Sequence, residues 1–323
     1  MRYGDFPFAR VRPSRLVFGT VSLNEEELEA GFDLLDAAFE AGYNAFDTAA
    51  LYGGGTCERV LGRWMEARGN RDEVFVIGKG AHHNSDRRRV TPFDITADLF
   101  DSLARQRHGR IDLHLLHRDD PDCDVGPIVE ILNEHHDAGR IGAFGGSNWT
   151  ASRIAEANEY AQKHGLVPFA ASSPNLSLAV QAQPPWAECL SLSGPDGAAD
   201  RDWYRRQGMP LFTWSSLAGG FFSGRLTRQN REEMGEEFGE WFTDCYFTED
   251  NFERLDRAGE LAAERGVSVP QVALAWVLHQ DLDIYALVAP RNARECEENA
   301  AVFDIELTGA ELEWLDLRRE QLF

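Results

Sequence analysis

The sequence contains little lysine, few cysteines and no long apolar run. Lys79 and Lys163 are its only lysines, so 30 of its 32 basic residues are arginines. No stretch of about 18 consecutive apolar residues occurs, which argues against a membrane-spanning helix. The opening residues, MRYGDFPFARVRPS, lack the apolar stretch of about 7 to 15 residues that a secretory signal peptide requires. These absences predict a protein that does not cross a membrane.

The cysteines are widely spaced and odd in number. The five are Cys57, Cys123, Cys189, Cys245 and Cys296, and no two have the CxxC spacing of a zinc or redox motif. This pattern argues against a disulfide framework and a cysteine zinc site, and it is typical of a reducing compartment. We therefore expect a cytoplasmic protein without a metal site.

Positive charge is scarce relative to negative charge. The chain has 54 acidic and 32 basic residues, a formal net charge of −22 and a pI of about 4.8. A field of that sign repels phosphate backbones and anionic lipid surfaces, so we expect neither nucleic acid nor a membrane as a partner. Apolar residues make up 43% of the chain, which is enough for a sizeable core and too much for a disordered protein.

Eight short apolar runs alternate with longer amphipathic segments along the whole chain, without a linker between them. The expected strands span 16–19, 44–47, 74–79, 113–117, 142–145, 169–172, 211–214 and 284–288. The expected helices span 24–41, 56–68, 94–108, 125–138, 150–164, 200–208, 251–265, 269–279, 293–300 and 308–320. This alternation predicts one α/β domain over residues 1–323, a (β/α)8 TIM barrel, with a doubly wound sheet as the alternative.

Two segments are longer than ordinary connections. Residues 181–199 and 221–250 follow the sixth and seventh expected strands. Long loops in a compact domain are commonly functional or mobile. We expect both at the barrel face that carries the active site, with the acidic run REEMGEEFGE (231–240) as a solvated or mobile lid.

Polar side chains stand at the ends of several expected strands. They are Asp47, Lys79, His117, Ser147, Asn148 and Ser173, with Tyr52 shortly after the second strand. In a (β/α)8 barrel these ends meet at one mouth, where catalytic groups converge. A nearby ammonium group lowers the pKa of a tyrosine, and a carboxylate orients the ammonium group. We therefore predict that Asp47, Tyr52 and Lys79 form an acid–base unit, with His117 beside it to orient a carbonyl group.

Six motifs in this order carry a resemblance to a known family. They are FDTAALYGGGTCERVLG (46–62), VIGKG (76–80), DLHLLHRDDP (112–121), GRIGAFGGSNW (139–149), FTWSSLAGGFFSG (212–224) and APRNARECEEN (289–299). Over nearly the whole chain, the sequence resembles the aldo-keto reductase superfamily. The resemblance implies a (β/α)8 barrel, NADPH or less often NADH as cofactor, and reversible hydride transfer to an aldehyde or ketone.

The resemblance also implies roles for individual residues. Tyr52 falls on the family's proton donor, and Asp47, Lys79 and His117 fall on the other three catalytic positions. Trp214 stands where an aromatic ring stacks on the nicotinamide. The positions implied for cofactor binding are Gly19, Thr20, Asp47, Ser147, Asn148, Ser173, Trp214, Ser215, Ser216, Leu217, Gly219, Ala289, Arg291, Glu295 and Asn299.

Two departures from the family pattern concern the cofactor. Ser173 stands where the family usually has Gln, and its hydroxyl group has a shorter reach. Arg291 suits the 2′-phosphate of NADPH through its bidentate guanidinium group. Glu295 would repel that phosphate and suits an unphosphorylated ribose. The sequence therefore leaves both NADPH and NADH open.

Other residues near the strand ends have structural interpretations. His114 and His117 face opposite sides of a strand and cannot share a metal ion, so we expect His114 to pack under a helix. We expect His82 and His83 to form a solvated pair in a loop. The glycines at 53–55 lack the Gly-Lys-Ser/Thr that follows in a phosphate-binding loop, and they indicate a turn beside Tyr52.

The expected substrate is a small carbonyl compound that accepts its proton from Tyr52. Tryptophans on or beside the mouth loops favour a sugar-like substrate, and they are Trp149, Trp186, Trp203 and Trp241. We expect Arg118, with Asp119 and Asp120, to form a structural ion cluster. The alternative function is a redox-sensing regulatory subunit that binds the cofactor with little turnover. No feature of the sequence indicates an oligomeric state.

Overall fold

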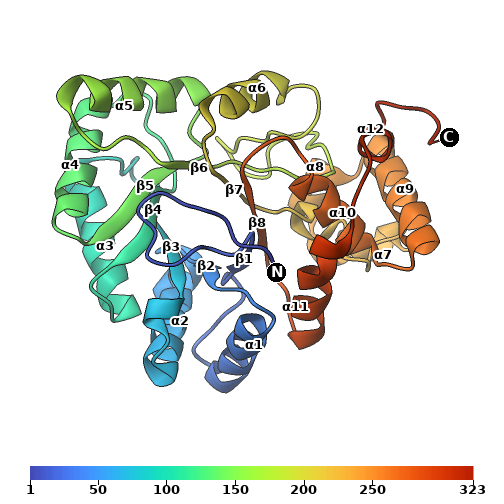
Figure 1. Ribbon diagram of the computed structural model, residues 1–323, viewed down its shortest axis with the longest axis horizontal. Coiled ribbons are helices and arrows are strands. Elements are labelled where there is room, and N and C mark those ends of the chain that lie inside the picture. The colour runs from blue at the N-terminus through green and yellow to red at the C-terminus, as the bar shows by residue number, and fades with distance from the viewer. Residues whose placement is uncertain (323) are drawn as a thin grey trace.

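The computed structural model describes residues 1–322 and contains a closed barrel of eight parallel strands (Figure 1). They are β1 (Leu16–Gly19), β2 (Ala45–Asp47), β3 (Phe75–Gly80), β4 (Ile111–Leu116), β5 (Ile141–Ser147), β6 (Ala171–Ser173), β7 (Leu211–Thr213) and β8 (Ile284–Val288). Neighbouring strands follow chain order, and β8 pairs in parallel with β1 through Leu287 and Val17. The predicted barrel is confirmed, because a doubly wound sheet would stay open at both edges.

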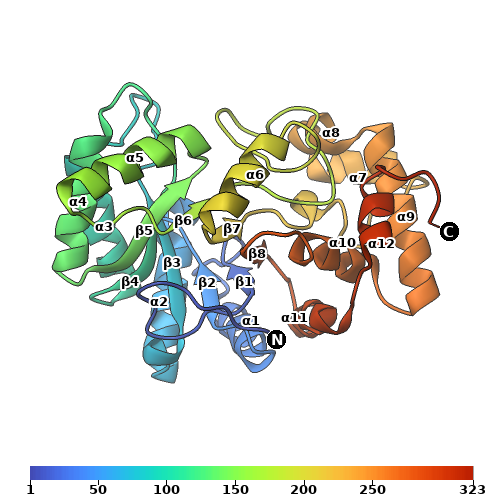
Figure 2. The ribbon, with the colours of Figure 1, turned by 45° about the horizontal axis from the view of Figure 1, so that its top comes forward.

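Helices surround the barrel, as Figure 1 and Figure 2 show from two directions. They are α1 (Leu28–Glu40), α2 (Thr56–Arg68), α3 (Pro92–Gln106), α4 (Val125–Asp137), α5 (Ala151–His164), α6 (Ala198–Gln207), α7 (Arg231–Phe238), α8 (Glu240–Tyr246), α9 (Glu249–Arg265), α10 (Val269–Leu278), α11 (Ala293–Ala300) and α12 (Gly309–Leu315). The predicted helix 24–41 begins too early, because Asn24 Oδ1 accepts a hydrogen bond from the Glu27 backbone in a turn. The predicted helix 308–320 is also too long, since α12 ends at Leu315.

The interior of the barrel is filled by alternate residues of the strands. These residues are Val17, Ala45, Phe75, Ile77, Leu113, Leu115, Ala143, Ala171, Phe212, Tyr285 and Leu287. Phe6 belongs to the N-terminal segment that crosses the front of the barrel in Figure 1. Its ring packs edge-on against Phe75 and Phe212, with centroids 5.5 and 5.4 Å apart. This segment plugs the amino-terminal end of the barrel and leaves the carboxyl-terminal end for a site.

The segment after β7 is not the long loop that the sequence predicted. Within 221–250 the chain forms α7 and α8, and the acidic run 231–240 lies largely in α7. Met234 and Phe242 are buried, and the rings of Phe238 and Phe242 stack with centroids 4.4 Å apart. Apolar contacts therefore anchor this segment as two short helices, while its glutamates remain on the outside. Segment 181–199, in contrast, is irregular up to the start of α6.

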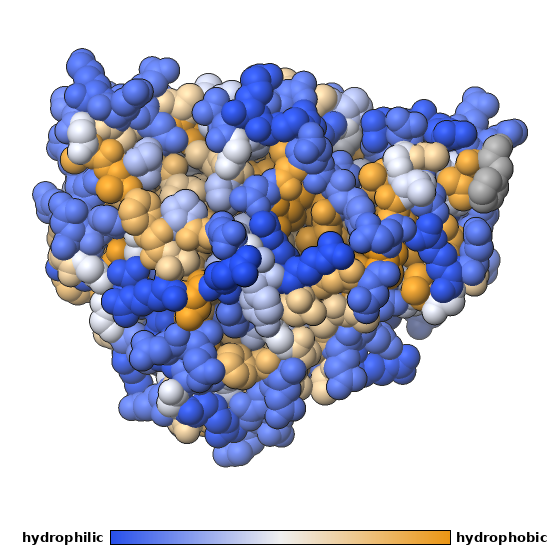
Figure 3. Space-filling view, in the orientation of Figure 1, coloured by the Kyte–Doolittle hydropathy of each residue, from blue (hydrophilic) through white to orange (hydrophobic). Residues whose placement is uncertain are grey.

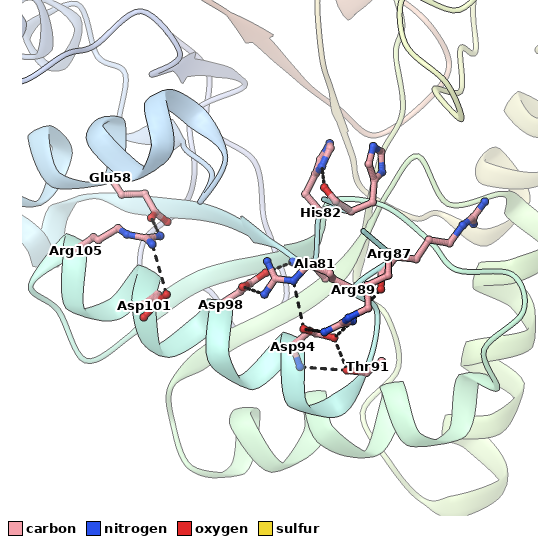
Figure 4. A network of polar contacts seen from close by, with 12 residues as sticks. Glu58, Ala81, His82, Arg87, Arg89, Thr91, Asp94, Asp98, Asp101 and Arg105 are labelled. Carbon is pink, nitrogen blue, oxygen red and sulfur yellow. Dashed lines mark hydrogen bonds and ion pairs between the residues drawn. The ribbon is translucent and has the colours of Figure 1, made fainter. Parts of the chain in front are cut away.

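Ion pairs tie the loop between β3 and α3 to the first turns of α3, as Figure 4 shows. Arg87 Nη1 lies 2.6 Å from Asp94 Oδ2, and Arg89 binds both Asp94 and Asp98. Asp98 Oδ2 also accepts a hydrogen bond from the Ala81 backbone at 2.8 Å. The Arg87 guanidinium group lowers the pKa of Asp94 to about 2, so this pair persists at neutral pH. The loop therefore holds its side chains at defined positions.

The outer surface agrees with the composition. Hydrophilic residues form most of the outline of the molecule in Figure 3. Such a surface is expected of a chain with 27% charged residues and a net charge of −22. Within residues 1–322, no helix combines the length and the apolar content that crossing a membrane would demand.

The structure confirms that His114 is buried, and this makes stability depend on pH. Burial lowers the pKa of His114 to about 4, and neither ring nitrogen has a hydrogen-bond partner among residues 1–322. As the pH falls below about 6.5, the unfolded chain protonates at this position before the folded chain does. Folding should therefore lose up to about 3 kcal/mol between pH 6.5 and 4 through this residue.

A His114→Leu variant should show a smaller loss of unfolding free energy over this range in urea denaturation. His164→Leu, which replaces an exposed histidine at the end of α5, serves as the control. If the free energy of unfolding depends on pH equally in His114→Leu and in the unmodified chain, burial of a neutral His114 does not cause this dependence.

Candidate active site

One inward-facing position at or just after the carboxyl-terminal end of each strand lies at the mouth of the barrel. Since successive residues of a strand face opposite sides, the position two residues beyond an inward-facing residue faces inward again. For β1 to β8 these positions are Gly19, Asp47, Lys79, His117, Ser147, Ser173, Trp214 and Ala289. All eight belong to the set predicted from the sequence, and the barrel brings them to one end.

A cavity of about 740 Å³ opens at this mouth. Its wall includes every predicted site residue except Thr20 and Ser173. The predicted residues on the wall are Gly19, Asp47, Tyr52, Lys79, His117, Ser147, Asn148, Trp214, Ser215, Ser216, Leu217, Gly219, Ala289, Arg291, Glu295 and Asn299. Thr20 and Ser173 are fully buried behind it, and their hydroxyl oxygens find no hydrogen-bond partner in the described part of the chain.

An ion pair between Asp47 and Lys79 lies at the inner end of the cavity. Lys79 Nζ donates hydrogen bonds to Asp47 Oδ1 and to Tyr52 Oη, the latter at 3.2 Å. Asp47 and Lys79 are each only 2% exposed, so the pair is shielded from water. A buried charge persists when it is paired and hydrogen-bonded, and each of these two residues supplies the partner of the other.

Tyr52 reaches the mouth through a tight turn rather than from a strand. It begins a short 3-10 helix, Tyr52–Gly55, directly before α2. Gly53, Gly54 and Gly55 have φ angles of 54°, 61° and 87°, a region that side chains strongly disfavour. The glycines let the chain turn into α2 immediately after the tyrosine. The predicted role of residues 53–55 in a turn is confirmed.

Burial decides the protonation state of Tyr52, whereas the Asp47 carboxylate decides that of Lys79. Desolvation raises the pKa of Tyr52 above its ordinary value, although the Lys79 ammonium group acts in the opposite direction. The predicted influence of Lys79 is therefore present but outweighed by burial. Burial also disfavours a charged Lys79, yet the neighbouring Asp47 carboxylate prevails and raises the pKa of that lysine. The result is a neutral phenol beside a charged ammonium group.

His117 completes the inner end of the cavity in its neutral form. Its ring stands edge-on to that of Tyr52, with centroids 5.9 Å apart. Burial, followed by the charge of Lys79, holds the pKa of His117 well below its ordinary value. Nδ1 of this ring has no partner among the described residues. A carbonyl oxygen placed between the two rings could accept a hydrogen bond from Tyr52 and from a neutral imidazole.

Asn148 and Asn175 hold Trp214 in place on the cavity wall. Asn148 Oδ1 accepts a hydrogen bond from Trp214 Nε1 at 3.2 Å, and Asn175 Nδ2 donates to the Trp214 carbonyl oxygen at 2.9 Å. Asn148 Nδ2 in turn donates to Ser147 Oγ at 3.3 Å. These hydrogen bonds hold the indole ring of Trp214 beside the polar side chains of Ser147 and Asn148.

Arg291 and Glu295 bind one another at the outer end of the cavity. Arg291 Nη2 lies 3.0 Å from Glu295 Oε1, and Glu295 Oε2 accepts a hydrogen bond from the Arg291 backbone at 2.9 Å. Burial opposes the charge of Glu295, but the bonds from Arg291 hold the pKa of this carboxyl group below its ordinary value. The two residues that favour opposite cofactors in the sequence therefore form an ion pair.

The cavity wall also contains residues that the sequence analysis did not assign to the site. Among them are Leu51, His82, His83, Arg118, Cys189, Arg225 and Phe238. Trp186, expected on or beside a mouth loop, also lies on the wall. His82 and His83 form the predicted pair, with ring centroids 4.2 Å apart. His83 is exposed, whereas His82 is half-buried, with its ring 4.9 Å from that of His117. The sequence signal that could have assigned His82 to the site is its position three residues after Lys79, just beyond the end of β3.

The predicted ion cluster around Arg118 does not form as expected. Asp119 pairs with Arg153 at 3.2 Å, and Asp120 lies 3.9 Å from Arg88. Arg118 makes no ion pair with either neighbour and faces the cavity instead. The side chains of these consecutive residues therefore serve different partners: Arg118 lines the cavity, whereas Asp119 binds Arg153.

Comparison with known proteins identifies relatives over almost the full chain. A family model described as Aldo/keto reductase family matches residues 15–317. The chain is 28% identical over 341 residues to a norsolorinic acid reductase of Emericella nidulans, covering 95% of this chain and 78% of that protein. It is 25% identical to an aryl-alcohol dehydrogenase (NADP+) of Phanerodontia chrysosporium, covering 89% and 75%. It is 26% identical to a probable voltage-gated potassium channel subunit beta of Oryza sativa, covering 94% of this chain and 92% of that protein.

The buried ion pair between Asp47 and Lys79 should contribute to the free energy of unfolding. Lys79→Met would leave the Asp47 carboxylate buried without a partner, which should lower the free energy of unfolding by about 3–5 kcal/mol. The double variant Asp47→Asn with Lys79→Met should recover a large part of that loss in urea denaturation. Arg68→Met, which breaks a half-exposed pair with Asp36, is the control and should cost less than about 1 kcal/mol. A Lys79→Met variant as stable as the control would refute the proposed role of the pair.

Proposed function

The chain belongs to the aldo/keto reductase family, and we propose that this oxidoreductase reduces an aldehyde or ketone reversibly to an alcohol with a nicotinamide dinucleotide. The observation that carries the proposal is the contact of a neutral Tyr52 hydroxyl with the charged Lys79 at the inner end of the cavity. His117 stands on the other side of the same space.

Tyr52 supplies the proton of the proposed reaction. A bound dinucleotide would supply the hydride for the carbonyl carbon. The Tyr52 hydroxyl would then give its proton to the carbonyl oxygen. Lys79 stabilises the phenolate that remains until a proton from water restores it, and Asp47 keeps Lys79 charged. His117 and Tyr52 together orient the carbonyl oxygen and stabilise the negative charge that develops on it.

The wall of the cavity fits a dinucleotide. Trp214 offers a flat surface for the nicotinamide, with Ser147 and Asn148 beside it to bind the amide group. The opposite end of the wall carries Arg291, whose side chain is 58% exposed and pairs with Glu295; its remaining N–H donors are available for a 2′-phosphate. We propose NADPH as the preferred cofactor. The name of the Phanerodontia relative, which includes NADP+, supports this choice.

The substrate end of the cavity favours an aromatic carbonyl compound over the sugar-like substrate suggested by the sequence. Trp186 lines the cavity together with Leu51, and its ring stacks on Trp241 at 5.5 Å and an interplanar angle of 19°. Trp149, in contrast, is fully buried. A stacked, half-exposed indole provides an apolar platform for a flat ring. An aryl-alcohol dehydrogenase among the relatives supports the same choice of substrate.

Replacement of the tyrosine tests the proposed reaction. Tyr52→Phe removes the proton donor and should lower kcat for NADPH-dependent reduction of benzaldehyde by roughly 10²- to 10⁴-fold. Its affinity for NADPH, measured by quenching of tryptophan fluorescence, should change by less than about threefold, because the hydroxyl group contacts the carbonyl and not the dinucleotide. Tyr3→Phe alters a surface tyrosine and should keep full activity.

The same assay separates an enzyme from a regulatory subunit. A regulatory subunit would bind NADPH but leave it unoxidised when aldehydes are added, and Tyr52→Phe would then change nothing. Retention of more than a tenth of the original kcat by Tyr52→Phe would rule out the role of this residue.

The Arg291–Glu295 pair predicts how the cofactor preference can be changed. Glu295→Gln removes a negative charge near the 2′-phosphate and releases Arg291, so NADPH should bind roughly tenfold tighter, equivalent to about 1.4 kcal/mol. NADH lacks that phosphate, and its affinity should change by less than about twofold. Glu297→Gln, which alters an exposed carboxylate on the same helix, is the control. An equal effect on both cofactors in fluorescence titrations would place the 2′-phosphate elsewhere.

A further inference from the structure

Arg118 is a buried cation without a counterion on the wall of the cavity. The residue is 7% exposed, and its guanidinium group donates two hydrogen bonds within residues 1–322, to the His117 carbonyl oxygen at 2.9 Å and to Cys189 Sγ at 3.6 Å. Its Nε atom is buried and has no partner in the described chain. A guanidinium group carries five N–H donors, so most of its capacity for hydrogen bonds is unused.

The acidic residues near Arg118 are already engaged elsewhere. Asp119 binds Arg153, and Glu188, which precedes Cys189, binds Arg88. Asp47 lies on the same cavity wall but is neutralised by Lys79. Within residues 1–322, Arg118 therefore has no carboxylate at ion-pair distance.

The groups around Arg118 leave its positive charge uncompensated. His82 and His117 lie on the same stretch of wall, 4.9 Å apart, and neither supplies a negative charge. The ion pairs of Figure 4 tie down the loop that carries His82, so this stretch cannot easily rearrange to cover the cation. Burial of an unpaired charge is unfavourable, and a bound anion would offset that cost.

We propose that Arg118 binds an anionic group of the substrate, and that the substrate is an aromatic aldehyde or ketone that carries a carboxylate. The inference rests on the proposed function, because it assigns this part of the cavity to the carbonyl compound. Arg118 follows His117 directly in the chain, so the carboxylate lies on the His117 side of the carbonyl group. The guanidinium group binds it through paired N–H donors, and the aromatic ring packs on the wall formed by Trp186.

Turnover of matched substrates tests the proposal. The acids 3- and 4-formylbenzoate are compared with their neutral methyl esters, which present the same aldehyde. For at least one of the acids, kcat/KM should exceed that of its ester by about 10- to 100-fold, the range expected for a charge-assisted pair in a buried site. Arg118→Met should abolish this ratio, because kcat/KM for the acid should fall by about 10- to 100-fold more than kcat/KM for the ester.

Two further variants separate the charge of Arg118 from other effects. Arg118→Lys keeps the charge but loses the bidentate geometry, and it should retain part of the preference for the acid. Arg88→Met removes a positive charge from the same neighbourhood without touching the cavity wall, and it should leave the ratio unchanged. Because acid and ester are compared within each variant, a general loss of activity does not alter the ratio.

A binding experiment without turnover distinguishes failure of this inference from failure of the proposed function. Calorimetry with benzoate and its neutral analogue benzamide should show at least tenfold tighter binding of benzoate to the unmodified protein, and loss of that difference in Arg118→Met. If benzoate binding depends on Arg118 while no aldehyde is reduced, the anion site stands and the proposed function fails. If aldehydes are reduced but benzoate and benzamide bind equally to the unmodified protein, the anion site is refuted.

Discussion

Closure of the barrel is the constraint on which the candidate site depends. Because β8 pairs with β1, each strand has one face that can only point inward, and apolar residues fill most of that space. Phe6 closes the amino-terminal end, so the last inward position of each strand becomes the floor of the cavity. Asp47, Lys79 and His117 meet there although they are far apart in the sequence. Their proximity follows from the parallel register of β2, β3 and β4.

Exclusion of water from the inner end of the cavity determines the charge states of the residues that meet there. A low dielectric constant strengthens the attraction between Lys79 and Asp47 and makes isolated charges costly. Tyr52 and His117 are therefore neutral beside a charged lysine, which is the arrangement that the proposed proton donor and its supporting groups would require. The compact ammonium group of Lys79 can contact Asp47 and Tyr52 at the same time. One of only two lysines in the chain thus occupies the position where a planar guanidinium group would fit poorly.

Charge pairing differs between the two ends of the cavity. At the outer end, Arg291 and Arg225 each bind a glutamate, Glu295 and Glu237 respectively. At the inner end, the only ion pair is internal to the acid–base unit, and Arg118 has none within the described residues. The surface of this acidic protein repels anions, whereas the unpaired guanidinium group of Arg118 in the cavity attracts them. Such a preference selects a ligand by its charge as well as by its shape.

The sequence by itself determined the barrel and most of the candidate site. Strand alternation and the polar residue at each strand end are local properties, and in a parallel barrel they suffice to place Asp47, Lys79 and His117 at one mouth. Only the tertiary structure decided how Tyr52 responds to its neighbours, because its pKa reflects burial and the charge of Lys79 together. It also decided that Arg118 has no acidic partner and that stacked phenylalanines anchor the segment after β7. These features depend on distances and on the exclusion of water, which exist only once residues remote in the sequence have packed together.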